Sequence, residues 1–286
     1  MIAGTRTTAL TVAIIAPGAM GSGIGGRLTE NKVAVLTSLQ GRSDASAARA
    51  RAAGMQDVDE RQLMEADIFL SIVPPGEALA TAKQVAPLLA TANRKPIYAD
   101  CNAVSPDTAA AIAAVIAEAG APFADAGIIG PPPKPGSSNT RIYVSGPASR
   151  QLARLNDHGL IVRVLSGPLT GASALKMSYA GITKGFTALG VAMLLAATRG
   201  GSAEALQAEL AESQQALLGF LSRQVPNMYA KAYRFVDELD EISEFVGRDH
   251  PESEMLAAAA RLYERIAEDF EGDKDEIAML DTFLGR

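Results

Sequence analysis

The chain has 286 residues, of which 48% are hydrophobic and 20% charged, with 26 basic and 32 acidic side chains. This length allows one large domain or two medium ones, and the apolar content is too high for general disorder. The net charge of −6 argues against nucleic acid as the main partner. One cysteine and two histidines leave little from which to build a zinc site, so we expect no metal. A single cysteine forms no internal disulfide, which is typical of the reducing cytoplasm.

The first predicted strand, 11–16, runs into the turn Pro17-Gly18-Ala19-Met20-Gly21, after which a helix is expected. Strand, turn and helix follow one another as in a G-x-G-x-x-G phosphate-binding turn, with Ala16 in the first glycine position. Gly18 would let the backbone approach a pyrophosphate, and Gly21 would let helix and strand pack closely. A plain strand-to-helix turn is the alternative, but the order of elements favours a dinucleotide site.

The second predicted strand, 32–36, lacks the acidic residue that holds the ribose 2′-hydroxyl in NAD sites. No acid occurs between this strand and Asp44. Arg42 and Ser43 stand there instead, and a guanidinium beside a hydroxyl suits a 2′-phosphate. We therefore expect NADP(H) to be preferred over NAD(H), the alternative being that Arg42 is a solvated loop residue.

Short apolar runs then alternate with alanine-rich helical stretches as far as residue 165. This alternation predicts βαβ units on a parallel sheet. The predicted strands are 68–73, 96–100, 122–125, 141–145 and 161–165, and the predicted helices include 46–53, 77–89 and 106–119.

Three segments follow strands of this sheet and should meet at its carboxyl edge, where ligands of open parallel sheets bind. The first is Val73-Pro74-Pro75, and the second runs from Asp100 to Pro106 and includes Asn102. The third runs from Asp125 to Pro132 and includes Ile128-Ile129-Gly130-Pro131. We expect the first two to contact the cofactor and the third to contact a small-molecule substrate.

The β pattern ends at Gly167, which predicts two domains, an α/β domain over 1–167 and an all-helical domain over 168–286. The helical domain should hold a long apolar helix, 171–198, buried on most sides, and a second helix that begins at Ser202 and ends at Pro226. Phe235, Leu239, Ile242 and Val246 form the apolar stripe of a third helix, and Pro251 opens a fourth that runs to about Phe270.

The uncharged stretch 185–198 is too short to span a membrane, so we expect no membrane partner. It is also too apolar for one small helical domain to cover. A second copy of the chain should therefore cover part of it, which predicts a homodimer.

Taken together, these motifs resemble the β-hydroxyacid dehydrogenase superfamily, which includes 6-phosphogluconate and 3-hydroxyisobutyrate dehydrogenases and, more distantly, imine reductases. The resemblance covers residues 11 to about 200. It rests on the turn from Ala16 to Gly21 with its methionine, on Asp100 to Pro106, on Asp125 to Pro131, and on the glycine-led approach Gly171 to Lys176. It implies a Rossmann-type amino-terminal domain, a helical carboxy-terminal domain and an NAD(P)-dependent oxidoreductase. The acidic tail resembles a less characterised domain found in a subset of these proteins.

The resemblance assigns to Lys176 the role of general acid and base, which exchanges a proton with the substrate oxygen while hydride moves at the nicotinamide. Lys176 and Lys184 are the only charged side chains between Gly171 and Thr198. Burying a lysine on an apolar helix costs about several kcal/mol, because its ammonium loses its hydration, unless the lysine is paired or functional. A lysine that extends its ammonium to solvent is the alternative for Lys176. For Lys184, a supporting contact, a cofactor contact and a plain structural role remain open.

Two departures from the family pattern remove polarity at the substrate end. The family has an asparagine where Ala180 stands, and a serine where Ile129 stands. Tyr179 could replace the asparagine, with Thr183 one turn later on the same helix. A bulkier or less polar carbonyl or imine then becomes a candidate substrate.

Two further functions stay open: an imine reductase on the same fold, and a nucleotide-sensing protein without turnover. Imine reductases generally lack the lysine, and a sensor needs no proton donor, so Lys176 favours carbonyl or alcohol chemistry. Arg234 could contact the cofactor or pair with Glu238, and His250 could reach a partner's site in a dimer.

Overall fold

The computed structural model describes residues 10–137 and 139–286, which form two compact units. One unit extends to Lys176 and the other from Met177 to Arg286. The division falls inside the long helix α6, Gly171–Arg199, rather than at the turn that precedes it. Contacts between the first turn of α6 and the sheet, described below, explain why this turn belongs to the first unit.

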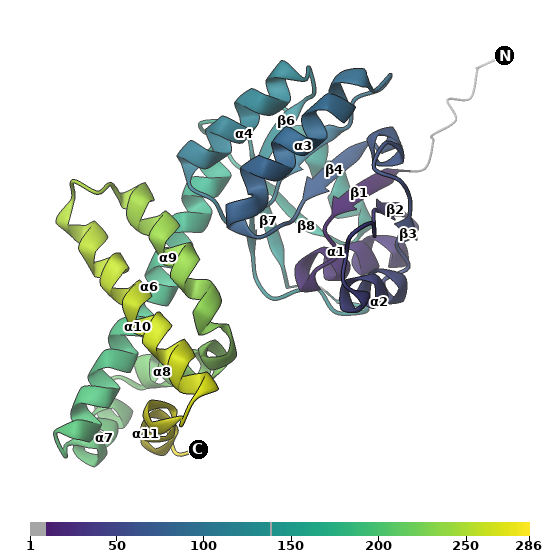
Figure 1. Ribbon diagram of the computed structural model, residues 1–286. Coiled ribbons are helices and arrows are strands. Elements are labelled where there is room, and N and C mark those ends of the chain that lie inside the picture. The colour runs from purple at the N-terminus through teal and green to yellow at the C-terminus, as the bar shows by residue number, and fades with distance from the viewer. Residues whose placement is uncertain (1–9, 138) are drawn as a thin grey trace. The chain divides into compact units, whose positions relative to one another are not determined.

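The first unit is built on one eight-stranded sheet with the strand order β3-β2-β1-β4-β5-β6-β7-β8 (Figure 1). Its strands are β1 Thr11–Ile15, β2 Ala34–Thr37, β3 Gln56–Asp57, β4 Ile68–Ser71, β5 Ile97–Asp100, β6 Phe123–Ile129, β7 Arg141–Ser145 and β8 Ile161–Val164. This architecture confirms the expected Rossmann-type α/β fold.

The expectation of a fully parallel sheet is wrong at one place. All pairs are parallel except β6 and β7, which pair antiparallel from Asp125↔Ser145 to Ile129↔Arg141. The described part of the connection between them, residues 130–137 and 139–140, contains no helix, and parallel neighbours need a crossover, commonly a helix. The short strand β3 was not predicted, because its two exposed polar residues give no apolar signal.

Helices cover both faces of the sheet. They are α1 Ala19–Glu30, α2 Asp44–Ala52, α3 Ala78–Thr91, α4 Pro106–Glu118 and α5 Ser149–Leu152, with 3₁₀ turns at Gln62–Glu65, Pro75–Glu77 and Ala153–His158. Strand β1 is buried on both faces: Val12 and Ile14 belong to the core under α1, and Ala13 and Ile15 to the core under α3 and α4. Because such strands are buried on both faces, their sequences are continuous runs of apolar residues.

The second unit is all helical, as predicted (Figure 1). After α6 come α7 Ala203–Ser213, α8 Gln215–Met228, a 3₁₀ turn at Tyr229–Lys231, α9 Ala232–Val246, α10 Pro251–Glu271 and α11 Asp275–Phe283. The single helix predicted from Ser202 is wrong, because the backbone leaves helical geometry at Gln214. Pro226 does not end that stretch either but lies within the last turn of α8.

The predicted stripe of α9 forms part of the core of this unit. Leu239 and Ile242 are fully buried, while Phe235 is half-buried and contacts the ring of Tyr263 on α10 edge to face at 5.4 Å between centroids. Lys184 of α6 forms an ion pair with Glu238 and lies 4.7 Å above the Phe235 ring. Both charged side chains are about nine-tenths buried, so their pairing is part of this core.

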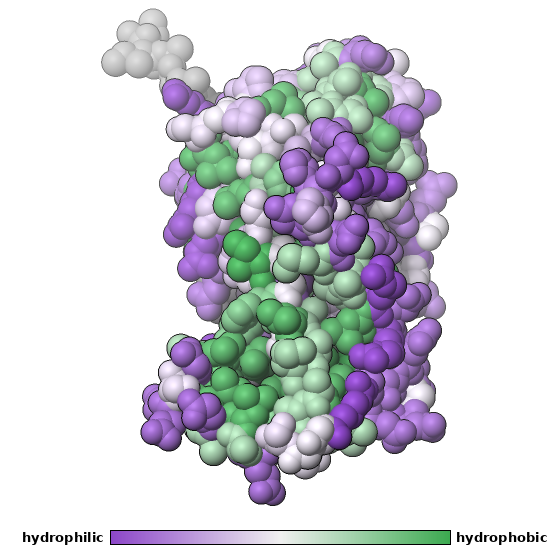
Figure 2. Space-filling view, turned by 90° about the vertical axis from the view of Figure 1, so that its left-hand side faces the viewer, coloured by the Kyte–Doolittle hydropathy of each residue, from purple (hydrophilic) through white to green (hydrophobic). Residues whose placement is uncertain are grey.

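One face of α6 differs from the expectation of a helix buried on most sides. Five large apolar side chains on it are 44–73% exposed, namely Tyr179, Ile182, Phe186, Leu189 and Met193. We call these five residues the α6 stripe. Figure 2 shows apolar surface gathered over one side of the helical unit, in the lower part of the view. By length and composition, α6 is the one helix among the described residues that could cross a membrane, and 33% of its most apolar window is buried.

Candidate active site

The turn between β1 and α1 is tight and depends on its glycines. The N–H of Gly18 donates to the carbonyl of Ala16 at 2.9 Å, and the Ser22 hydroxyl donates to the carbonyl of Gly18 at 2.7 Å. A Cβ at position 21 would stand 2.4 Å from the Ala16 carbonyl oxygen, so only glycine lets α1 start this close to β1. A Cβ at position 18 would meet nothing within 4 Å. The space beside Gly18 is therefore open to a ligand.

This turn fits the pyrophosphate of a dinucleotide. Gly18 caps α1 and has no side chain that could bond the first N–H groups of the helix. N–H groups at a helix start attract anions. Pro17 is buried, Ala19 is exposed, and Met20 packs partly against the sheet core. Of the predicted turn residues, the backbone of Gly18 and Ala19 is thus best placed to face a phosphate.

An arginine that no sequence motif indicated lies beside the turn. Arg49 of α2 donates from Nε to the Pro17 carbonyl at 3.3 Å and from Nη2 to the Ser46 hydroxyl at 2.8 Å. Its position in a short alanine-rich helix gave no signal, because only the packing of α2 brings it to the glycines. Arg49 adds positive charge where a phosphate would bind.

Past the end of β2, an open pocket of about 640 Å³ contains Arg42. Ser43 stands at the N-terminus of α2, where its hydroxyl accepts from the N–H of Ser46 at 3.3 Å. The same pocket holds Arg51 and the acids Asp57 and Asp59, which arrive with β3 and the loop after it. The acid that was missing after β2 in the sequence is therefore supplied in space by another strand, and this pocket offers both guanidinium and carboxylate groups.

Asn102 joins the ends of two neighbouring strands. Its Oδ1 accepts from the N–H of Val73 at 2.7 Å, and its Nδ2 donates to Ser71 at 3.1 Å and to Asp100 at 2.5 Å. Asn102 is buried, whereas Pro74 is exposed and Pro75 half-buried. The side chain of Asn102 thus holds the segment 73–75 in place, and that segment faces solvent at the sheet edge.

Two buried carboxyl groups lie side by side on neighbouring strands. Asp100 of β5 and Asp125 of β6 are register partners, and both are 0% exposed. Burial raises the pKa of Asp100 to about 7, against the hydrogen bond from Asn102, and the charge of Asp125 raises it further. Burial also raises the pKa of Asp125, while hydrogen bonds from the hydroxyl and the N–H of Ser173 lower it. We assign the proton that such a pair retains near neutrality to Asp100.

Lys176 is held against β6. A Cβ on Gly127 would stand 2.7 Å from the Ala172 carbonyl oxygen and 3.1 Å from the Cβ of Lys176, so glycine allows strand and helix to touch here. Lys176 is half-buried and follows the first turn of α6. The lysine is therefore placed beside the second half of β6.

The predicted substrate segment is split between strand and loop. Ile128 and Ile129 are buried in β6, which is longer than predicted, and Ile128 belongs to the sheet core. Gly130 and Pro131 are exposed, and Gly130 has a φ of +125°. The side chain of Ile128 is thus a packing residue, and Gly130 marks the point where the chain leaves the sheet.

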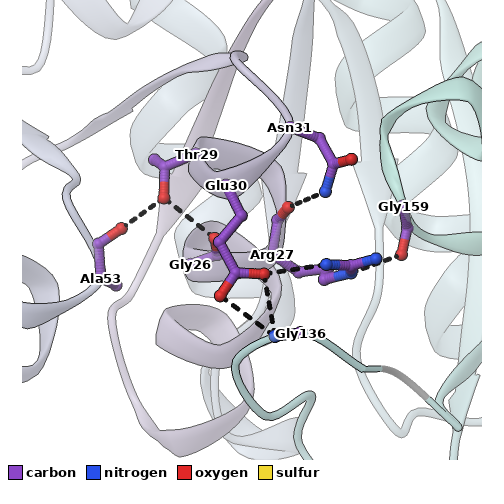
Figure 3. Close-up of polar contacts among 8 residues, drawn as sticks. All are labelled: Gly26, Arg27, Thr29, Glu30, Asn31, Ala53, Gly136 and Gly159. Atoms are coloured by element: carbon purple, nitrogen blue, oxygen red, sulfur yellow. Dashed lines mark hydrogen bonds and ion pairs between the residues drawn. The ribbon is translucent and has the colours of Figure 1, made fainter.

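The loop that follows folds back onto α1. Gly136 donates its N–H to Glu30 at 3.2 and 3.3 Å, and Glu30 also accepts from Arg27 at 2.9 Å (Figure 3). These bonds, first that from Arg27 and then that from Gly136, hold the pKa of Glu30 below its usual value. A Cβ on Gly23 would come within 3.0 Å of Pro133, so loop and helix are in close contact. Helix α1 and the loop after β6 are therefore packed against each other.

Comparison with known proteins identifies this arrangement. Residues 11–156 match the family model described as the NAD binding domain of 6-phosphogluconate dehydrogenase. The chain belongs to this family. Residues 197–266 match a second model, described as a domain of unknown function (DUF1932). No curated protein sequence matches the chain.

Solved structures with the same fold cover nearly the whole chain. A conserved protein of unknown function, described as structurally similar to 3-hydroxyacid dehydrogenases, is 27% identical with a TM-score of 0.72, over 95% of this chain and 99% of that one. 3-Hydroxyisobutyrate dehydrogenase of Mycobacterium tuberculosis is 18% identical with a TM-score of 0.72, over 96% and 99%. An imine reductase from Myxococcus stipitatus is 19% identical with a TM-score of 0.57, over 97% and 100%.

These matches confirm the resemblance to the hydroxyacid dehydrogenases and imine reductases that the motifs indicated. In this NAD-binding domain of the 6-phosphogluconate dehydrogenase type, the turn at Gly18 is the element that would hold the pyrophosphate. Among the described residues, no group of three or more His, Cys, Asp and Glu side chains could hold a metal ion.

The other predicted residues lie in the helical unit. Tyr179 is 48% exposed, Ala180 is buried, and the Thr183 hydroxyl donates to the Tyr179 carbonyl at 2.9 Å. The ion pair of Lys184 with Glu238 favours a structural role for this lysine over a cofactor contact. It also occupies Glu238, the residue expected to pair with Arg234. His250 precedes Pro251 at the start of α10 and is exposed.

Proposed function

We propose that this protein is an NADP-dependent oxidoreductase that moves hydride between the nicotinamide and a small hydroxy or carbonyl substrate. The observation that carries the proposal is the contact between Gly127 and the backbone and Cβ of the turn that bears Lys176. It holds the Cβ of Lys176 beside the strand that leads into the loop at Gly130, within the unit that contains the dinucleotide turn. The nicotinamide supplies or accepts the hydride when bound.

Within this proposal Lys176 is the general acid in reduction and the general base in oxidation. Its amine donates a proton to the substrate oxygen as hydride arrives, and takes it back in the reverse direction. The backbone at Gly130 and Pro131, in the same unit as Lys176, is our candidate for substrate contact. The apolar residue Ile129, where the family has a serine, favours a substrate less polar than a small hydroxy acid.

The preference for NADP(H) rests on positive charge near the end of β2. Arg42 lies in the pocket at that strand end, and Arg49 is bonded to the phosphate turn. A guanidinium binds a phosphate through two parallel N–H groups, which suits the 2′-phosphate. Asp57 and Asp59 in the same pocket could instead accept from ribose hydroxyls, as the acid of an NAD site does. Measuring the affinity for NADPH and for NADH therefore tests whether the cofactor contacts Arg42 or the carboxylates of Asp57 and Asp59.

The test of the function is the variant Lys176→Met, which keeps the bulk of the side chain and removes its proton. With NADPH and a panel of carbonyl compounds and cyclic imines, we expect turnover on carbonyls to fall by roughly 10²–10⁴ while NADPH binding stays unchanged. Lys83→Met, an exposed lysine of α3, is the matched control and should keep full activity.

Two outcomes would reject the proposal in different ways. A wild-type protein that reduces imines but no carbonyl, with turnover kept in Lys176→Met, would support the imine-reductase function instead. Tight NADPH binding without turnover on any compound of the panel would support a nucleotide sensor.

We also infer that the protein acts as a homodimer in the cytoplasm. The exposed α6 stripe supports a partner of the same kind, because its 3–4 spacing is self-complementary between two such helices. The buried free thiol of Cys101 fits a reducing compartment.

A further inference from the structure

Asp125 contacts the helix that carries Lys176. Its Oδ1 accepts from the Ser173 hydroxyl at 2.6 Å, and its Oδ2 accepts from the Ser173 N–H at 2.8 Å. The Ser145 hydroxyl lies 3.2 Å from Oδ2 but only 2.8 Å from the Leu169 carbonyl, to which we assign its proton. Both oxygens of one buried carboxylate are thus engaged by a single residue, three positions before Lys176.

These bonds complete the N-terminal cap of α6. The first four N–H groups of a helix have no partner within it. Here Gly171 donates to Pro168 and Ala174 to Thr170, each at 3.1 Å, which leaves two groups. Ala172 donates to the Ser145 hydroxyl at 2.9 Å, and Ser173 donates to Asp125. The cap therefore comes from side chains of β6 and β7, so the sheet determines where α6 begins and how it is rotated.

The same strand sets the height of the lysine. Asp125 and Gly127 point to one face of β6, because side chains two residues apart share a face. Asp125 attracts the first turn of α6, and Gly127 leaves room for it down to 3.1 Å from the Lys176 Cβ. The negative charge of Asp125 also suits the positive end of the helix dipole. One strand thus supplies both the attraction and the space.

We propose that Asp125 is a positioning residue for Lys176, acting through Ser173 and the cap of α6. This inference rests on the proposed function for its importance in catalysis, but the placement of the lysine can be measured without a substrate. A buried aspartate that only stabilised the fold would loosen the whole sheet when changed. A positioning residue loosens the first turn of α6 and its lysine.

The experiment compares Asp125→Asn with Asp100→Asn in the full chain. Asp100 is the matched control, because it is a register neighbour buried to the same extent and bonds Asn102 rather than α6. Amide hydrogen exchange followed by mass spectrometry reports on residues 171–178. The rate of amine acylation by acetic anhydride reports on Lys176, with Lys83 as internal standard.

We expect Asp125→Asn to speed exchange in 171–178 about tenfold and to raise the acylation rate of Lys176, because an asparagine cannot accept from Ser173 with both of its polar atoms. Asp100→Asn should leave both readouts unchanged. Equal loosening of α6 by the two variants, or no change with Asp125→Asn, would overturn the proposal. If Asp125→Asn fails to fold, Ser173→Ala removes only the hydroxyl bond and should give the same changes at a smaller amplitude, and their absence counts equally against it.

Once a substrate is found, Asp125→Asn should lower kcat and leave NADPH affinity unchanged. If Lys176→Met proves fully active, the proposed function fails, while the exchange and acylation results still decide whether Asp125 places the lysine. The two failures are therefore distinguishable.

Discussion

At the scale of single residues, two ionisable groups have surroundings that the sequence could not show. Arg42 shares its pocket with Asp57 and Asp59, and Asp100 is buried beside Asp125. The sequence shows which ionisable residues are present, but the groups around each one in the fold decide what it binds and what its pKa is. Each of these groups leads to a measurable expectation.

For the cofactor, Arg42→Ala should weaken NADPH binding by about 1.5–3 kcal/mol, the range for a hydrogen bond to a charged group. NADH affinity should hardly change, because NADH lacks the 2′-phosphate. Calorimetric titration of both cofactors measures this, and Arg61→Ala, an exposed arginine outside the pocket lining, is the control. Equal affinity of the unmutated protein for the two cofactors would contradict the assignment and point to Asp57 and Asp59 as ribose ligands.

For stability, Asp100 should make the folded state less stable as the pH rises. Its pKa is about 7 in the folded chain, mainly through burial, against an ordinary value of 3.8. Between these two values the unfolded chain has released the proton while the folded chain keeps it, so the free energy of unfolding falls with rising pH and levels off above 7. The loss is on the order of a few kcal/mol at most.

The variant Asp100→Asn should remove this decline, because asparagine does not titrate. Urea unfolding at pH 5 and pH 8 tests it: the wild type should lose more stability between the two than the variant does. Asp125 also has a raised pKa and is coupled to Asp100 through its charge, so the difference between the two profiles reports on the pair, with Asp100 as the member that burial shifts to about 7. Parallel pH profiles would show that Asp100 does not carry the proton.

At the scale of elements, the junctions between strands and helices decide the candidate site. β1 meets α1 at Gly21, and β6 meets α6 at Gly127. At each position a Cβ would stand too close to a backbone carbonyl oxygen, that of Ala16 or that of Ala172, so only glycine fits. Such contacts let the elements approach, whereas Gly18 at the first junction faces open space. Two glycines three residues apart thus have different roles.

Gly21→Ala and Gly18→Ala should separate these roles. Gly21→Ala should destabilise the fold by about 1–3 kcal/mol or more, as overpacking against backbone does. Gly18 has φ −68° and ψ −172°, which alanine adopts readily, so Gly18→Ala should leave the melting temperature nearly unchanged. NADPH affinity of Gly18→Ala should fall tenfold or more, since the new methyl group occupies the space of the pyrophosphate. Unfolding and binding titrations measure both effects, and a reversal of the pattern would refute them.

At the scale of the whole molecule, the α6 stripe holds five of the eight large apolar side chains that are exposed among the described residues. Its members recur at intervals of three and four residues along a helix of 29 residues. Large exposed apolar faces are uncommon on monomers and often belong to interfaces. We therefore expect a second copy of the chain to cover the α6 stripe.

We expect light scattering at micromolar concentration to give about twice the chain mass of 29.7 kDa. The interface should exceed about 2,000 Å², as in obligate dimers. The double variant Ile182→Glu and Leu189→Glu should shift the protein to monomers, whereas Met255→Glu, at an equally exposed apolar residue of α10, should not. A monomeric wild type would rule out this interface.

The amino-acid sequence by itself determined the alternation of strands and helices in the first unit, apart from β3, and the nature of the turn at Gly18. Apolar runs bounded by turn residues are set by local sterics and burial, so β1, α1 and α9 could be predicted from neighbours within a few residues. The family motifs likewise lie within short segments, which is why the NAD-binding domain could be recognised before the fold was known.

Tertiary structure alone decided the rest. The bonds from Ser173 to Asp125 join residues 48 positions apart, Asp57 and Asp59 reach the Arg42 pocket with a two-residue strand, and β7 reverses against β6. The exposed face of α6 could not be told from a buried one, because composition records how apolar a helix is and not what covers it. Contacts of this kind depend on which elements the folded backbone brings together, and no local pattern of residues encodes that choice.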